Sequence, residues 1–278
     1  MLNPNQIIEK SIDPFPHVII KNFFNKDFYN KLENEFPKKK VFLNYKNNVG
    51  RMHHDTTFGH DLYQDILDNS NVYNELHNYI YSDNFIKTFI NFFSSEIDNE
   101  INKSFLQINV KKIDIDSTPF EVGKIYNKQN FKKKENFFLY PRLDIGMGEK
   151  GYGINTGGNG IHVDNPQRLI SILFYVGGYS EMQGGEHRLW KALDKKAQMV
   201  KEIKPEPNLL IASLQNNISY HDVNPISQIT GTRNAFYIAI SCSNPIWKKV
   251  KVNDFNLKHN RNRCKLNFFS KLMKKLTA

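Results

Sequence analysis

The residues in this sequence best suited to do chemistry are two histidines and one aspartate. His162 and Asp164 are two positions apart, so on an extended strand their side chains project from the same face. His221 follows 59 positions after His162 (221 − 162), just beyond an apolar segment that could return a strand beside the first. Two imidazole nitrogens and one carboxylate oxygen can together hold a metal ion.

A metal held on one face by these three groups keeps three coordination positions free. This arrangement suits iron(II) that reacts with dioxygen, whereas a saturated site would be structural only. A keto acid can fill two of the open positions through its carboxylate and keto oxygens, and dioxygen can fill the third. His162, Asp164 and His221 therefore predict an iron(II) site that activates dioxygen.

A keto acid with a second carboxylate needs a cation at its far end, and Arg233 is the candidate. It lies 12 positions after His221 (233 − 221), at the start of an apolar run. Its planar guanidinium can pair with a carboxylate through two N–H groups. Because a buried unpaired arginine is costly, an arginine that points into a barrel implies an anionic ligand. Tyr175, on the strand expected after Asp164, can donate a hydroxyl to the same carboxylate.

These motifs resemble the Fe(II)- and 2-oxoglutarate-dependent dioxygenase superfamily, and in detail its prolyl-hydroxylase-like branch. The resemblance covers about residues 100–245, with further support upstream. The matching segments in chain order are Asp13 to His17, His162 to Pro166, Ile172 to Val176, Gln183 to Glu186, His221 to Ile226 and Gly231 to Arg233.

The resemblance implies oxidative decarboxylation of 2-oxoglutarate to succinate and CO2, usually with hydroxylation of an unactivated C–H bond in a substrate. It assigns the metal ligands to His162, Asp164 and His221, and 2-oxoglutarate binding to Arg233 and Tyr175. No catalytic residue beyond the metal centre is implied. The cofactors would be Fe(II), 2-oxoglutarate and dioxygen, and a role for ascorbate is compatible with them. The sequence departs from the pattern at Ala235, where some branches place Ser or Thr.

The elements that must position these residues predict a mainly β fold with N-terminal helices (α+β). The resemblance implies that its core is a double-stranded β-helix, jelly-roll or cupin-like, buttressed by the helices. Asn25 can cap a helix with Phe28, Leu32 and Phe36 on one face, which Pro37 would end. A second helical stripe runs from Phe85 to Ile97. Short apolar or alternating runs predict strands at 15–23, 105–110, 137–145, 169–176, 209–214 and 235–241.

We expect one oxygenase domain over residues 1–247, with helical support over about 1–100 and the β-helix core over about 101–247. Residues 248–278 form a basic tail. It has ten Lys or Arg between Lys248 and Lys275, against the single acid Asp254. Its apolar residues from Leu266 to Leu276 predict an amphipathic helix. Docking on the body is the expected outcome; peripheral membrane contact, a protein partner or partial disorder are the alternatives.

Composition narrows the remaining classes. A chain of 278 residues with 40% hydrophobic content can bury one sizeable core. No secretory signal is visible, and two cysteines cannot form a disulfide framework, so we expect a soluble, cytoplasmic protein. The net charge of +10 raises the question of a nucleic-acid partner, but A/T-rich codons for Lys, Asn, Ile and Phe explain it as well. We therefore expect no nucleic-acid partner.

Other polar clusters have plainer interpretations. We interpret His53, His54, Asp55, His60 and Asp61 as a polar loop near the pocket mouth, with a rival metal site as the alternative. Residues 157–160 favour a flexible loop over a phosphate loop, because no Lys-Ser/Thr follows. Ordinary packing is the default for Tyr152, and surface strand positions are the default for His187, Arg188 and Trp190.

Two rival functions stay open at this point: a non-catalytic β-barrel that binds a ligand or partner, and an oxygenase directed at nucleic acid. The sequence does not name a substrate. A protein side chain, a free amino acid, a sugar and a lipid-linked glycan are all compatible with it.

Overall fold

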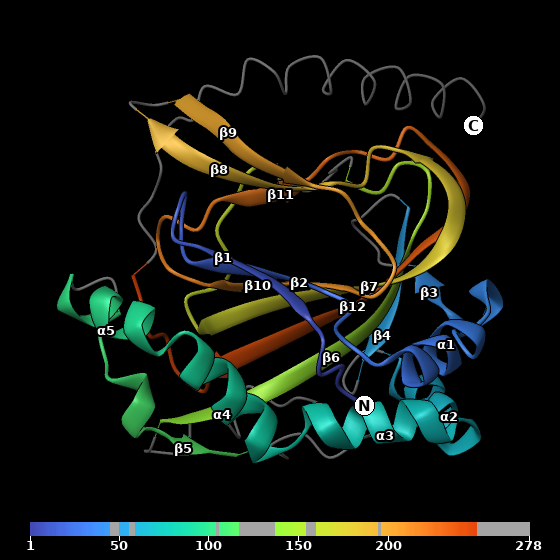
Figure 1. Ribbon diagram of the computed structural model, residues 1–278, viewed down its shortest axis with the longest axis horizontal. Helices are drawn as coiled ribbons and strands as arrows, with labels where there is room; N and C mark the ends of the chain where they lie inside the picture. Colours follow the sequence, from blue (N-terminus) through green and yellow to red (C-terminus); the bar gives the residue numbers. More distant parts are fainter. Residues whose placement is uncertain are drawn as a thin grey trace, which may run out of the picture.

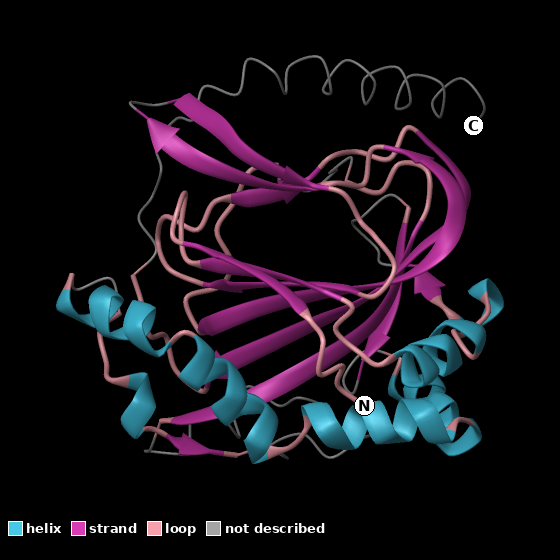
Figure 2. Ribbon diagram, in the orientation of Figure 1, coloured by secondary structure: helices cyan, strands magenta, loops and turns pink. Residues whose placement is uncertain are grey.

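Three layers make up the described part of the chain: a layer of helices, a large sheet and a small sheet (Figures 1 and 2). The computed structural model describes residues 1–44, 50–55, 59–103, 106–116, 137–153, 160–193 and 196–248. The sequence prediction of a mainly β fold with N-terminal helices is confirmed at this level. The predicted basic tail lies outside the described residues, apart from Lys248.

The large sheet has nine strands in the order β1-β2-β10-β7-β12-β6-β4-β3, with β5 beside β6. Among the described strand pairs, β5–β6 alone is parallel. The strands are β1 (Ile7–Ser11), β2 (His17–Lys21), β3 (Leu43–Asn44), β4 (Arg51–Asp55), β5 (Asp114–Ile115), β6 (Phe138–Gly148), β7 (Arg168–Gln183), β10 (Leu209–Leu214) and β12 (Gln228–Cys242).

The small sheet has three antiparallel strands in the order β11-β8-β9: β11 (His221–Val223), β8 (His187–Leu193) and β9 (Lys196–Ile203). An isolated bridge pairs His162 with His221 and so adds the His162 segment to the free side of β11. The small sheet lies across the face of the large sheet that the helices leave open (Figure 1).

The helices cover the opposite face of the large sheet (Figure 2). They are α1 (Lys26–Asn34), α2 (His60–Asn69), α3 (Asn71–Ile80), α4 (Asp83–Phe92) and α5 (Ser94–Asn102), with short 3₁₀ turns η1 (Lys39–Val41) and η2 (Val110–Lys112). The side chain of Asn25 caps α1 as predicted, by accepting a hydrogen bond from Phe28 N. Phe174 and Phe236 stack on the helix side of the sheet with ring centroids 5.6 Å apart.

The strand register decides which side chains share the inner face, between the two sheets, because antiparallel partners point the same way. Three successive rows cross the large sheet on this face. The first is Ser213, Ser171, Ala239 and Arg142; the second is Ile211, Leu173, Tyr237, Asp144 and Asp55; the third is Leu209, Tyr175, Ala235, Gly146 and His53. Segments far apart in the sequence thus line one space.

Several sequence expectations differ from the structure. The first third contributes β1 to β4 to the large sheet, where the sequence indicated one early strand. β2 and β4 pair with the distant strands β10 and β6, and β1 and β3 pair with β2 and β4. Residues 106–110 form no strand; Val110 starts a 3₁₀ turn that Asn109 caps. The expected polar loop at His53, His54 and Asp55 is wrong, since these residues lie buried in β4 and pair with β6.

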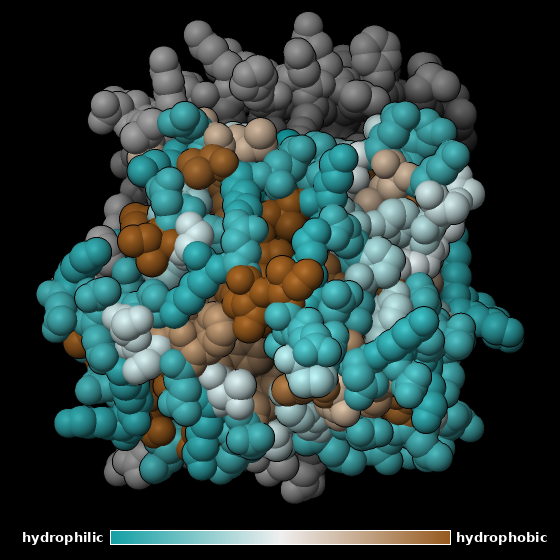
Figure 3. Space-filling view, in the orientation of Figure 1, coloured by the Kyte–Doolittle hydropathy of each residue, from teal (hydrophilic) through white to brown (hydrophobic). Residues whose placement is uncertain are grey.

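The described surface carries apolar side chains where β1 forms the edge of the large sheet. Ile7, Ile8 and Ile12 are 61%, 49% and 72% exposed. An apolar patch lies over the middle of this face in Figure 3. None of the described helices is long and apolar enough to cross a membrane.

His77 gives the fold a pH-dependent contribution to stability. Its ring packs at 4.3 Å on Tyr81 and meets the Tyr63 hydroxyl at 2.8 Å, and burial lowers its pKa from 6.5 to about 4. Below pH 6.5 the unfolded chain takes up this proton and the folded chain does not, so stability falls as the pH decreases toward 4. When the pH is lowered from 7 to 5, we expect the unfolding free energy of the wild type to fall by about 1–2 kcal/mol more than that of His77→Gln. Urea unfolding at both pH values measures this, and identical losses would refute it.

Candidate metal centre

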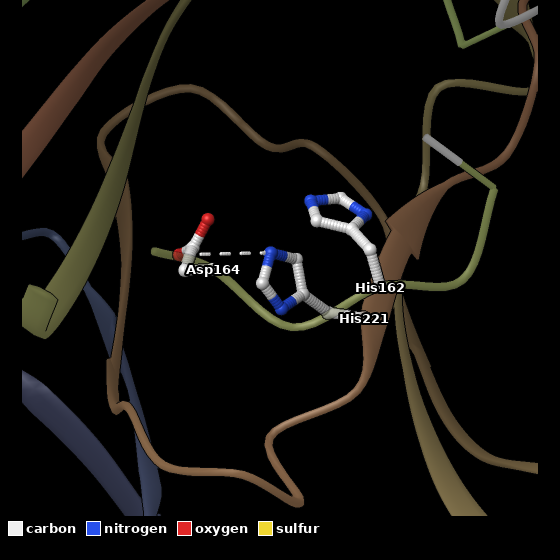
Figure 4. Close-up of side chains that lie close together, drawn as sticks. All are labelled: His162, Asp164 and His221. Carbon is white, nitrogen blue, oxygen red and sulfur yellow. Dashed lines mark ion pairs between the residues drawn. The ribbon is translucent and has the colours of Figure 1, made fainter. Parts of the chain in front are cut away.

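Three side chains converge at one end of the space between the sheets. The ligand atoms of His162, Asp164 and His221 all lie within 4.8 Å of one another. In Figure 4 the carboxylate and the two imidazoles point toward a common centre, and His221 Nε2 lies 3.9 Å from Asp164 Oδ2. The structure therefore brings together the three residues that the sequence selected.

Backbone carbonyls orient both histidines. Nδ1 of His162 donates to the Gly160 carbonyl at 2.8 Å, and Nδ1 of His221 donates to the Ser219 carbonyl at 2.9 Å. Because a carbonyl only accepts, both rings carry their proton on Nδ1 and leave the Nε2 lone pair for a metal. The antiparallel bridge between the two residues sets their rings 4.6 Å apart.

Asp164 is held by two groups. The Ser171 hydroxyl donates to Oδ2 at 2.5 Å, and Arg168 Nη1 lies 3.1 Å from Oδ1. Burial raises the pKa of Asp164, but Arg168, the two histidines and the Ser171 hydroxyl lower it to a value well below its usual range. Burial and the neighbouring His221 lower the pKa of His162 to about 4. At neutral pH Asp164 is therefore a carboxylate and His162 a neutral imidazole, and these are the forms that bind a metal.

Removing the Ser171 hydroxyl tests this support. We expect Ser171→Ala to weaken iron(II) binding by about 10- to 100-fold, because the carboxylate ligand loses the group that orients it. Anaerobic titration with iron(II) measures the affinity. Ser213→Ala is the matched control, since Ser213 lies in the same row of the sheet and its hydroxyl accepts from Gln215 at 2.8 Å. Equal affinities for Ser171→Ala and Ser213→Ala would contradict the role of Ser171.

A cavity of about 350 Å³ opens beside the three ligand atoms. Both sheets contribute to its wall, and so does the loop that contains Tyr152. Its wall includes the three candidate ligands together with Ser171, Leu173, Tyr237, His187, Arg142, Asp144, Arg51 and His53. The open side of the candidate metal centre thus faces a space large enough for small molecules.

Arg233 lies fully buried, and no carboxylate among the described residues pairs with it. Nη1 donates to the Tyr237 hydroxyl and Nη2 to the Tyr175 hydroxyl, both at 3.0 Å. Nε donates to the Gly185 carbonyl at 3.1 Å. A buried guanidinium held only by neutral acceptors favours an anion that completes its pairing.

Tyr152 and Tyr237 connect Arg233 to the cavity, since both line it. Their hydroxyls are 2.9 Å apart, and the Tyr152 ring lies 5.2 Å from the guanidinium carbon. Tyr152 is buried, as ordinary packing predicts, and it also lines the cavity. Burial raises the pKa of Tyr175 to about 12, so its phenol stays a donor at neutral pH.

Sequence reasoning missed Tyr237 and Ser171, and it placed His187 on the surface. Tyr237 is four positions after Arg233, so strand alternation was a usable signal for it. His187 was expected on the surface, but it is only 9% exposed and its ring lies 5.5 Å from that of His221. Its Nδ1 is buried and has no hydrogen-bond partner. Burial lowers the pKa of His187 well below its usual value, so it faces the cavity as a neutral ring.

The other residues after the glycine pair orient Asp222. Arg188 pairs with its carboxylate through Nε at 2.8 Å and Nη2 at 2.5 Å, and Trp190 Nε1 donates to it at 2.8 Å. Asp222 follows His221 directly, so this network fixes the strand that carries one of the candidate ligands. Arg188 and Trp190 are partly buried rather than freely exposed.

A second group of possible ligands lies beside the same cavity: His53, Asp55 and Asp144 have ligand atoms within 4.8 Å of one another, and His53 and Asp144 line the cavity. Here a guanidinium already pairs with both acids. Arg142 Nε donates to Asp144 at 3.0 Å, and Arg142 Nη2 donates to Asp55. Burial raises the pKa of Asp144 to about 7, against the opposing effect of Arg142. The second group is therefore a network of paired charges, whereas the two imidazoles and the carboxylate of the first group leave one side open to the cavity.

No protein-family model and no curated protein sequence matches this chain. Among solved structures, the chain is similar to a prolyl-4-hydroxylase from Pseudomonas putida, with 12% identity, a TM-score of 0.38 and coverage of 81% of this chain and 91% of that chain. A prolyl hydroxylase from Trichoplax adhaerens, in complex with a hypoxia inducible factor peptide, gives 14% identity, a TM-score of 0.38 and coverage of 81% and 83%.

A viral collagen prolyl hydroxylase from Paramecium Bursaria Chlorella virus-1, in a 2-oxoglutarate complex, gives 13% identity, a TM-score of 0.39 and coverage of 81% and 94%. TM-scores in this range do not establish a common fold. The function below therefore rests on the geometry of the site.

Proposed function

We propose that this protein is an Fe(II)- and 2-oxoglutarate-dependent dioxygenase that hydroxylates an unactivated C–H bond. In this proposal His162, Asp164 and His221 bind the iron, and the two facing sheets form a double-stranded β-helix. Arg233 and Tyr175 bind the distal carboxylate of 2-oxoglutarate.

One observation carries the proposal. Two imidazole Nε2 atoms and one carboxylate converge beside an open cavity. Arg233, which is buried and has no carboxylate partner among the described residues, contacts Tyr152 and Tyr237 in the wall of that cavity. Two nitrogens and one oxygen on one side of a metal suit iron(II) oxygenases. A dicarboxylate with a keto group satisfies both needs at once, because one end can chelate the metal and the other can pair with Arg233.

The chain's own residues would perform three tasks. The carbonyls of Gly160 and Ser219 hold the two ligand rings with Nε2 toward the metal. Ser171 and Arg168 keep the Asp164 carboxylate ionised and oriented. Arg233 orients the co-substrate. Bound iron would supply the oxidation of 2-oxoglutarate and substrate by dioxygen, which yields succinate and CO2.

The decisive experiment measures succinate from purified protein. Succinate should form only when iron(II), 2-oxoglutarate and dioxygen are all present, even at the slow rate of uncoupled turnover without a substrate. Mass spectrometry of candidate substrates should then find one added oxygen. A protein that binds iron, as shown by titration, and forms no succinate would instead support the non-catalytic β-barrel.

A further inference from the structure

We propose that the substrate of this protein carries a negatively charged group, a carboxylate or a phosphate, and that Arg142 binds it. This inference rests on the proposed function, since it names the class of molecule that the candidate iron site would oxidise. It starts from the part of the cavity wall beside the candidate metal ligands to which the proposed function assigns no role.

Arg142 is fixed in place by two carboxylates. Its Nε donates to Asp144 and its Nη2 to Asp55, and Asp55 is fully buried. These two bonds lock the plane of the guanidinium and remove most of the side-chain entropy that binding would otherwise cost. Its Nη1 makes no hydrogen bond to any described residue, and its side chain is 37% exposed and lines the cavity. A fixed guanidinium with free N–H donors that face a cavity suits an anion.

The register places this donor at a useful distance from the metal. Arg142 lies in the same row as Ser171, whose hydroxyl contacts Asp164, and only Ala239 stands between them. Two strand spacings separate Arg142 from Ser171, about 10 Å between their backbones. Because the alanine side chain is small, the space above it stays open to a ligand. A molecule held by its anionic end at Arg142 can therefore extend a few bonds toward the iron.

The charges around the cavity lead to the same class of ligand. We count the described charged residues of the cavity wall together with the charged residues that pair with them or contact a tyrosine of the wall. Five arginines belong to this set: Arg51, Arg142, Arg168, Arg188 and Arg233. Four aspartates belong to it: Asp55, Asp144, Asp164 and Asp222. Among these described residues the arginines exceed the aspartates by one. Bound iron(II) and 2-oxoglutarate would cancel each other's charge and leave that excess unchanged.

The excess grows when Asp144 is protonated, and burial raises its pKa to about 7. Burial lowers the pKa of His53 to about 3, so this residue of the wall adds no positive charge at neutral pH. In a partly enclosed site an uncompensated charge is costly, so a substrate that brings one negative charge is favoured over a neutral one.

Matched pairs of ligands test the charge. The panel consists of α-amino acids, 2-hydroxy acids and sugar phosphates, each with its neutral counterpart: the carboxamide of each acid and the free sugar of each phosphate. Binding to the protein loaded with Mn(II) and 2-oxoglutarate, and to the protein alone, is measured by isothermal titration calorimetry. We expect the charged form of at least one pair to bind about 10- to 100-fold more tightly, the effect of a charge-assisted hydrogen bond. The carboxylate and phosphate arms identify which anion fits.

Two variants test whether the anionic group binds at Arg142. The double variant Arg142→Gln/Asp55→Asn removes the cation together with its buried partner, so that Asp55 is not left as an unpaired charge. We expect it to bring the affinity ratio of charged to neutral form close to one, while Arg142→Lys keeps most of the ratio. Succinate release by the wild type, with and without each ligand, is measured in parallel.

The outcomes separate the two proposals. Equal binding of charged and neutral forms, no binding of any panel member at millimolar concentration, or an unchanged ratio in the double variant would each overturn the anionic-substrate proposal. Absence of uncoupled succinate from the wild type would instead count against the dioxygenase, and the calorimetric ratio would still report on Arg142.

Discussion

An Asp164→Ala variant should lose iron binding and 2-oxoglutarate-dependent succinate formation together. Asp164 is the only carboxylate of the three candidate ligands, and Ser171 and Arg168 hold it ionised beside the two imidazoles. Without it, only the two histidines remain, and they supply neither the negative charge nor the third ligand that iron(II) needs. Because loss of a residue that only orients a ligand already costs about 10- to 100-fold in affinity, we expect more than about 100-fold here.

The measurement is an anaerobic iron(II) titration followed by a succinate assay at saturating iron. Asp68→Ala is the matched control, since Asp68 is an exposed acid on α2 that accepts a hydrogen bond from Gln64. Circular dichroism shows whether both variants keep the fold. Full succinate turnover by Asp164→Ala would refute the metal site.

An Arg233→Met variant should bind 2-oxoglutarate at least about 30-fold more weakly. Removing one partner of a buried, hydrogen-bonded charge pair costs about 2–5 kcal/mol, and methionine keeps much of the apolar bulk of the arginine stem. Tyr175→Phe removes one hydroxyl and leaves the guanidinium, so we expect only about a tenfold loss. The order of these two effects follows from the contacts, because Arg233 also holds Tyr237 and the Gly185 carbonyl.

Pyruvate is the matched ligand for this test, since it has the chelating keto acid but no distal carboxylate. The wild type should prefer 2-oxoglutarate strongly, and Arg233→Met should lose that preference while it binds pyruvate as the wild type does. Calorimetry with Mn(II) in place of iron gives both affinities. A 2-oxoglutarate preference that survives in Arg233→Met would show that another cation binds the distal carboxylate, and Arg51 would be the next candidate because it lies 4.6 Å from the Tyr237 ring.

The helices and most central strands could be predicted from local patterns. The stripe from Phe85 to Ile97 predicted helix, and the structure divides it between α4 and α5 at Phe93. The strands β6, β7, β10 and β12 lie where apolar runs predicted them. The strand predicted over residues 105–110 was wrong for the described residues 106–110. Their apolar residues match a strand pattern, but no described strand pairs with them.

Which strands pair, and in which register, could not be predicted. The segment at His53 and Asp55 looks like a polar loop because its side chains are hydrophilic. In the structure both are buried, since β4 pairs with β6 and brings Asp55 opposite Asp144. The pairing buries charges that offset one another, and no pattern within either segment reveals that compensation.

By itself, the sequence selected the candidate ligands and the arginine, because a spacing of two residues puts His162 and Asp164 on one face of an extended segment and an apolar run begins at Arg233. Only the tertiary structure decided what surrounds them: the Ser171 and Arg168 contacts to Asp164, the tyrosines around Arg233, His187 beside His221, and Arg142 in the same sheet row as Ser171. The physical reason is that a strand's own periodicity fixes the direction of its side chains, whereas the register between strands fixes their neighbours.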